Sequence, residues 1–236
     1  MKKEKIGLFG IFYLLFLPLV IFSGQPLFLL IISFFLGYLL FLLFQKPSLK
    51  KLLIFVVVLG ITIIIVKPRL GLDMGQINNI NAQRGEHPQY QSSLIPRVIH
   101  NKTELVHSFI SNFDSLLSPV AIFASGYWHK ISRYYPLGFL FPWDLYFIYR
   151  YFRYKKNIYD VKQWLLFIPA VLILFLLTGL IYIDQALVYS FAVIYFLALL
   201  SAVGYETASK RTRITFIIIN TVYLLYQLRI TSYFKI

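Results

Sequence analysis

The chain contains no cysteine among its 236 residues, which excludes disulfide bonds, thiolate metal sites and cysteine nucleophiles. Charge is scarce as well: 14% of the residues are charged, whereas a soluble globular domain carries about 25%. Acidic residues are rarest, with 9 Asp and Glu against 23 Lys and Arg. The sequence also lacks a glycine-rich phosphate loop, a serine nucleophile elbow and a zinc-protease motif, so it indicates no cofactor and none of these enzyme classes.

Apolar residues are abundant instead. They make up 59% of the chain, aromatic residues make up 19%, and the mean hydropathy is +0.72. The formal net charge of +14 would suggest nucleic acid in a soluble protein. Here the cations flank long apolar runs, so membrane topology and anionic lipid headgroups explain them more simply. The composition therefore predicts an all-α, polytopic integral membrane protein that does not bind nucleic acid.

Seven apolar stretches predict about seven transmembrane helices, because a lone strand cannot satisfy its backbone in lipid. Three form an N-terminal part (1–66), a long structured loop follows (67–135), and four form a C-terminal part (136–236). We read the basic, apolar N-terminus as a retained first helix, with a cleaved signal peptide as the alternative. The stretches are 6–22, 26–44, 52–66, 137–152, 164–183, 186–205 and 214–234.

The short connections between apolar stretches alternate between those that carry basic residues and those that carry none. Lysines or arginines precede the first stretch and lie between stretches two and three, four and five, and six and seven. The opposite short connections, Ser-Gly-Gln-Pro and Asp-Gln, carry no basic residue. By the positive-inside rule the N-terminus is cytoplasmic, and the outer segment, defined here as residues 67–135, faces away from the cytoplasm of the inner or plasma membrane.

The second half of the outer segment carries apolar residues at helical spacing: Leu105, Phe109, Phe113, Leu116 and Leu117. This pattern predicts an amphipathic helix along the membrane surface, capped by position 101 or 103 and ending near position 118.

The first half of the outer segment holds a polar island, Gln-Arg-Gly-Glu-His. Arg84 can grip a phosphate through its planar guanidinium, and Glu86 and His87 can serve as catalytic acid or base. The cluster suits the headgroup of a polyprenyl-phosphate-linked sugar. A solvated loop with a local Arg–Glu pair explains the same residues.

Further cations of the outer segment are candidate substrate-binding residues. Arg97, His100 and Lys102 can complete an anion site or form the polar flank of the surface helix. His129 and Arg133 lie among aromatic residues and can contact the substrate or lipid headgroups. No two histidines have the i, i+4 spacing of a helical zinc pair, so we predict no metal site.

Asp144 lies inside the fourth apolar stretch, next to Pro142 and Trp143. A buried polar group at membrane depth is costly and is a functional candidate by default. A position near the end of the stretch would instead let the carboxylate reach water or an arginine.

The outer segment and the helix after it resemble the C-terminal half of bacterial GT-C-type membrane glycosyltransferases, which are related to dolichyl-phosphate-mannose–protein mannosyltransferases. The resemblance implies a polyprenyl-phosphate sugar as donor. The acidic catalytic loop of that family has no counterpart here, because the first outer connection contains no carboxylate. The similar segments are 84–86, 100–102, 117–119, 138–145 and 162–172.

We therefore expect a truncated or partner-dependent glycosyltransferase component that handles a lipid-linked sugar at the outer face. A non-catalytic membrane subunit that docks a partner protein through the outer segment is a second hypothesis. A small-molecule transporter, motivated by Asp144, is a third.

Overall fold

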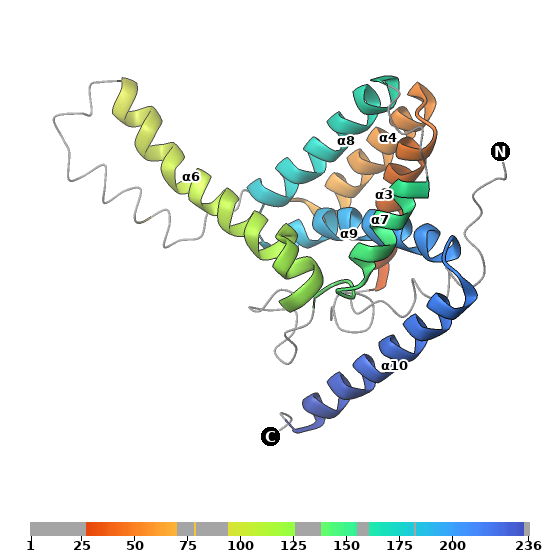
Figure 1. Ribbon diagram of the computed structural model, residues 1–236. Coiled ribbons are helices and arrows are strands. Elements are labelled where there is room, and N and C mark those ends of the chain that lie inside the picture. Colours follow the sequence, from red (N-terminus) through yellow and green to blue (C-terminus); the bar gives the residue numbers. More distant parts are fainter. Residues whose placement is uncertain are drawn as a thin grey trace.

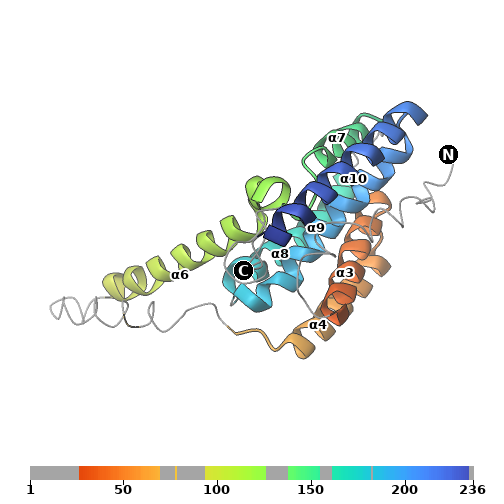
Figure 2. The ribbon, with the colours of Figure 1, turned by 90° about the horizontal axis from the view of Figure 1, so that it is seen from below.

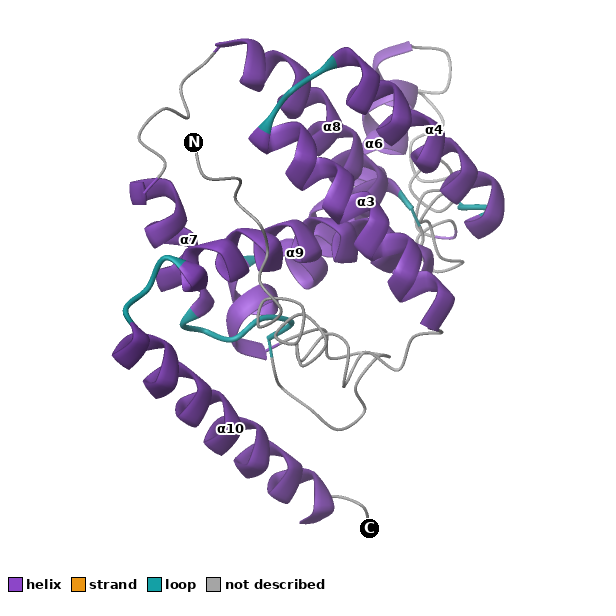
Figure 3. Ribbon diagram, turned by 90° about the vertical axis from the view of Figure 1, so that its right-hand side faces the viewer, coloured by secondary structure: helices purple, strands orange, loops and turns teal. Residues whose placement is uncertain are grey.

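The computed structural model describes residues 27–69, 78, 94–125, 138–154, 161–181 and 183–233, and within these ranges the side chains of 94–105, 124–125, 161–163, 183–184, 224 and 227–233 are left out. Every regular element in this part of the chain is helical, with no strand (Figure 3). The elements are α3 (Leu27–Gln45), α4 (Leu49–Val66), α6 (Leu94–Leu117), the π-helical turn η2 (Ala121–Ser125), α7 (Asp144–Tyr154), α8 (Val161–Leu180), α9 (Ile183–Glu206) and α10 (Lys210–Tyr233).

Three of these helices are long and apolar enough to cross a membrane: Leu27–Gln45, Leu49–Val66 and Gln185–Glu206. They confirm that the second, third and sixth apolar stretches are helical. The stretch 164–183 also forms an apolar helix, α8, and 214–234 falls largely within α10. The first stretch lies outside the described residues.

The fourth stretch differs from its prediction. Only its second half is helical, because α7 begins at Asp144, and residues 138–143 before it form bends and a turn. Pro142 disfavours a helical conformation in the residue before it, and Asp144 closes a turn on Phe141. Eleven helical residues extend about 16 Å, roughly half the thickness of a bilayer core, so α7 by itself does not span one.

Helix α9 forms the centre of the bundle. It packs against α3, α7 and α8, and nearly all of its residues are buried. Seen from below, α8 and α9 lie between α6 on one side and the α3–α4 pair on the other (Figure 2). A helix that is apolar all round needs such surroundings, which explains its lack of a polar face.

Glycines set the closest helix contacts. A Cβ atom on Gly37 of α3 would lie 2.6 Å from the carbonyl oxygen of Ala192 in α9. A Cβ atom on Gly204 of α9 would collide with the backbone carbonyl of Phe147 in α7. Small residues let helices approach to backbone contact, as is common in membrane bundles.

Helix α6 projects from the bundle, with its N-terminal half directed away from the other described helices (Figure 1). Its end at Leu117 agrees with the predicted end near position 118. Its start does not: the helix begins at Leu94, so Asn101 and Thr103 lie inside it and the predicted cap was wrong. Ser93 precedes Leu94 in the sequence, and Pro96 is compatible with a first helical turn.

Helix α10 begins with a side-chain cap. The Ser209 hydroxyl accepts a hydrogen bond from the Thr212 N–H at 3.2 Å, which satisfies one free donor of the first turn. The first half of α10 packs on α7, where the Phe216 and Phe147 rings lie 4.6 Å apart. Beyond this contact α10 runs away from α9 (Figures 1 and 3).

Large apolar side chains cover the outside of the bundle. On α4 they follow one broad face, and Ile64 is 72% exposed. Soluble proteins rarely leave such continuous apolar surface open to water. The exposed members on α4, α8 and α10 are Leu49, Leu53, Ile54, Val56, Val57, Ile61, Ile64, Ile65, Leu165, Ile168, Leu172, Ile173, Leu176, Ile214, Ile217, Ile218, Ile219, Val222, Leu225 and Tyr226.

Candidate functional site

The polar island of the outer segment lies outside the described residues. This applies to the predicted catalytic residues Glu86 and His87 and to the predicted phosphate ligand Arg84. The candidate substrate contacts His129 and Arg133 lie outside them as well. Their assignments therefore stay predictions.

Three predicted substrate-binding positions fall in one described helix. Arg97, His100 and Lys102 belong to the N-terminal half of α6, within two turns of one another. This half of α6 stands away from the other described helices (Figure 1).

The C-terminal half of α6 is fixed to the end of α8. The buried Asn112 side chain donates hydrogen bonds to the carbonyl oxygens of Gly179, at 3.1 Å, and Ile181, at 3.0 Å. The last carbonyls of a helix have no partner within it, so one side-chain amide here satisfies two acceptors at the α8 end. We call this contact between α6 and α8 the Asn112 anchor.

Aromatic packing completes the Asn112 anchor. A Cβ atom on Gly179 would overlap the Phe109 ring, so glycine is needed for the ring to rest on the α8 backbone. The Phe113 ring meets Phe175 edge-on, 5.5 Å between centroids. Phe109, Phe113, Leu116 and Leu117 share one face of α6, as their spacing predicts, and that face packs on the bundle. The anchor thereby holds the helix that carries positions 97, 100 and 102.

Asp144 lies in the interior, with an exposed fraction of 0%. One carboxylate oxygen accepts a hydrogen bond from the Phe141 N–H at 2.9 Å, and the other accepts one from the Ser201 hydroxyl at 2.8 Å. The first bond closes the turn before α7, and the second joins α7 to α9. The side chain therefore links two helices and starts one of them.

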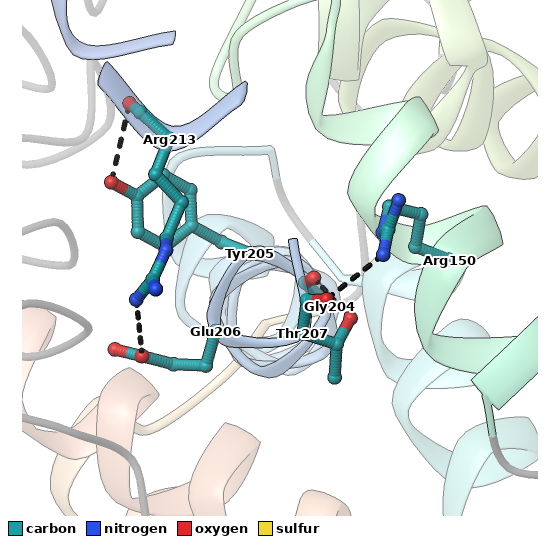
Figure 4. A network of polar contacts seen from close by, with 6 residues as sticks. All are labelled: Arg150, Gly204, Tyr205, Glu206, Thr207 and Arg213. Atoms are coloured by element: carbon teal, nitrogen blue, oxygen red, sulfur yellow. Dashed lines mark hydrogen bonds and ion pairs between the residues drawn. The ribbon is translucent and has the colours of Figure 1, made fainter. Parts of the chain in front are cut away.

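A polar network at the C-terminal end of α9 was not singled out from the sequence (Figure 4). Arg150 of α7 donates to the Thr207 carbonyl at 2.8 Å, which places a cation at the negative end of the α9 dipole. Arg213 forms an ion pair with Glu206 at 3.4 Å, and the Tyr205 hydroxyl donates to the Arg213 carbonyl at 3.3 Å. These contacts fix the turn between α9 and α10.

The sequence offered one clue to this network, namely where its charged residues lie. Arg150 and Arg213 belong to the basic residues that flank the predicted inner connections. Charge position alone does not reveal which carbonyl a guanidinium reaches. Within the described ranges, no group of three or more His, Asp or Glu side chains is close enough to hold a metal ion.

Comparison with known proteins finds no match: no family model, no curated protein and no solved structure is similar to this chain.

Proposed function

We propose that the chain is a polytopic protein of the inner or plasma membrane, with about seven membrane segments and a cytoplasmic N-terminus. In this proposal the outer segment, 67–135, handles a polyprenyl-phosphate-linked sugar as a partner-dependent, GT-C-like glycosyltransferase component. Arg84, Arg97, His100 and Lys102 would bind the phosphate, with His129 and Arg133 nearby. Glu86 or His87 would transfer a proton. Helix α7 would be a half-span whose crossing is completed by residues before it.

Contacts between helix ends predicted to lie outside support this topology. The Gln185 side chain accepts a hydrogen bond from the Arg69 N–H at 2.7 Å and donates to the Lys67 carbonyl at 3.4 Å. It thereby joins the predicted outer end of α4 to the predicted outer start of α9. The Asn112 anchor likewise joins the outer segment to the end of α8 that is predicted to be outside.

Contacts between segments predicted to be inside agree with the same orientation. Arg150 and Thr207, which are hydrogen-bonded, belong to two different predicted inner junctions. Phe44, at the end of α3, packs against Tyr151 and Trp164 with ring centroids 6.3 and 6.1 Å apart. A miscounted span between any of these elements would have placed the partners on opposite faces of the membrane.

The Asn112 anchor is the observation that carries the functional proposal. It fixes one half of α6 to the bundle and leaves the half with positions 97, 100 and 102 projecting (Figure 1). A cationic helix end held at a membrane surface is suited to a phosphate-bearing lipid headgroup.

Native mass spectrometry of the full chain in mild detergent tests the proposal. We expect a co-purifying isoprenoid-phosphate species that is lost in Arg84→Ala and reduced in Arg97→Gln. Lys50→Gln removes the same charge from the predicted opposite face and is the matched control. Retention of the lipid in Arg84→Ala, or its equal loss in Lys50→Gln, would refute the phosphate site.

A non-catalytic docking subunit is the second candidate function. The projecting half of α6 and the part of α10 beyond its contact with α7 both stand away from the described helices (Figure 1). Such surfaces suit a partner membrane protein. A stoichiometric second polypeptide in the same experiment, with no isoprenoid phosphate, would favour this function over the first.

Transport receives less support from the geometry. Asp144, which motivates that hypothesis, accepts hydrogen bonds from the Phe141 N–H and the Ser201 hydroxyl and thereby joins α7 to α9. Loss of substrate flux in a correctly folded Asp144→Asn variant would support the transporter hypothesis.

A further inference from the structure

A groove lies between α7 and the first turns of α10, with a volume of about 360 Å³. This volume is within the range of small-ligand sites, about 300–1,000 Å³. The described residues that line it are Trp143, Tyr146, Phe147, Arg211, Thr212, Thr215, Phe216 and Ile219. None of them belongs to the outer segment, so the groove is separate from the site proposed above.

The lining changes from polar to apolar along α10. Arg211, Thr215 and Ile219 follow one another at intervals of four residues, and Thr212 and Phe216 form the adjacent row on the same face. From Arg211 to Ile219 the helix rises about 12 Å. The α7 side adds aromatic rings: Trp143 is partly buried, and Tyr146 is 45% exposed. The groove is thus amphipathic, with its cationic end at the start of α10.

The polar end has unused hydrogen-bonding capacity. Thr212 is engaged with Ser209, whose hydroxyl oxygen lies 2.8 Å from its own. In the part of the chain that is described, neither the Arg211 guanidinium nor the Thr215 hydroxyl has a hydrogen-bond or ion-pair partner. A guanidinium and a hydroxyl on successive turns match the oxygens of a phosphate.

A second cation stands beside the groove. The Arg150 guanidinium lies 5.9 Å from the centre of the Tyr146 ring, which forms part of the wall, and donates to the Tyr146 hydroxyl at 3.2 Å. Its Nε atom is buried and has no hydrogen-bond partner. The local field at this end of the groove is therefore positive.

We propose that the groove binds one anionic phospholipid of the surrounding bilayer. Arg211 and Thr215 hold the headgroup phosphate, and an acyl chain runs along Trp143, Phe216 and Ile219. Basic pockets between membrane helices on the cytoplasmic side recognise lipid headgroups in this way. The basic end of α10 is also the end predicted to be cytoplasmic. The bound lipid bridges α7 and α10, whose Phe147 and Phe216 rings are in contact, as are the rings of Trp143, just before α7, and Tyr223.

Titration of phosphatidylglycerol into the full chain in a non-ionic detergent, read by native mass spectrometry, tests this inference. We expect one tightly held lipid and weaker binding of phosphatidylcholine. Arg211→Gln should lower the affinity for phosphatidylglycerol about tenfold, the effect of one charge-assisted contact. Ile219→Trp, which fills the apolar end, should lower the affinity for both lipids. Thr215→Val, which preserves side-chain shape and removes the hydroxyl that holds the phosphate, should also lower the affinity for both lipids and keeps the test open if the tryptophan variant does not fold.

Lys210→Gln is the matched control, because it removes one charge from the neighbouring position without touching the groove lining. It should change the affinity by less than about threefold, as expected of a screened surface charge. Equal losses in Lys210→Gln and Arg211→Gln would overturn the inference. So would equal binding of both lipids, or full displacement of phosphatidylglycerol by inorganic phosphate, which would indicate a site for a free anion.

Discussion

Removal of the Asn112 side-chain amide should undock α6 from α8. Asn112→Ala deletes two hydrogen bonds, at 3.1 and 3.0 Å, to the carbonyls of Gly179 and Ile181. Each contributes about 1 kcal/mol net, and a carbonyl left without any partner costs about 1–3 kcal/mol more. The contact should therefore weaken by about 2 kcal/mol where water replaces the amide, and by about 3–5 kcal/mol where one carbonyl stays without a partner.

Hydrogen–deuterium exchange of the full chain in detergent measures this effect. A loss of 2 kcal/mol raises the exchange of amides that open with the contact by about thirtyfold. We expect this rise in 106–117 and at the C-terminal end of α8, with α3 and α9 little changed. Ser111→Ala, on the exposed side of α6, is the control and should be neutral. Unchanged exchange in Asn112→Ala would refute the anchor as a link between the outer segment and the bundle.

The glycine of the same contact allows an independent check. Gly179→Ala places a methyl group into the Phe109 ring and should destabilise the docked state by about 1–3 kcal/mol. Phe109→Ala in the same chain removes the clash. The double variant should therefore be less unstable than the sum of the two single changes.

Two further predictions concern the contact of α9 with α7. Gly204→Ala should sharply lower the thermal unfolding temperature in detergent, because its new methyl group meets the Phe147 backbone carbonyl. The control Gly60→Ala has open space around it and should be neutral or slightly stabilising. Equal effects of the two variants would contradict the packing of α9 on α7. Asp144→Ala should cost about 2–3 kcal/mol by removing the partners of the Phe141 N–H and the Ser201 hydroxyl. Asp144→Asn, which keeps an acceptor, should cost about half as much in the same unfolding assay, and an Asp144→Ala variant as stable as the parent would refute the linking role.

The sequence predicted helices well where apolar residues run without interruption. The stretches that became α3, α4 and α9 carry enough apolar surface that only helices can satisfy their backbones in lipid. The prediction of helices failed where local backbone and side-chain interactions compete with hydropathy. Residues 138–143 are apolar, yet Pro142 and the Asp144 turn keep them out of α7. Hydropathy measures burial and does not report on backbone turns.

The candidate site was predictable only in outline. The spacing of Phe109, Phe113 and Leu116 indicated that they share one face of α6, but the prediction placed that face along the membrane surface, whereas it packs on the bundle. Asn112 lies on that same face, but its role depends on carbonyls 67 and 69 residues away in the sequence. The α7–α10 groove needs the same kind of long-range information, because Arg211 looks from sequence like any other basic residue of an inner connection.

The orientation of the chain can be measured directly, because the protein contains no cysteine and every single-cysteine variant is unambiguous. Gln91→Cys lies in the outer segment, and Lys50→Cys lies at a predicted inner connection. With a membrane-impermeant maleimide on intact cells, the account predicts labelling of Gln91→Cys at once and of Lys50→Cys only after permeabilisation. Labelling of Lys50→Cys in intact cells, or protection of Gln91→Cys, would contradict the outward placement of residues 67–135 on which the proposed function depends.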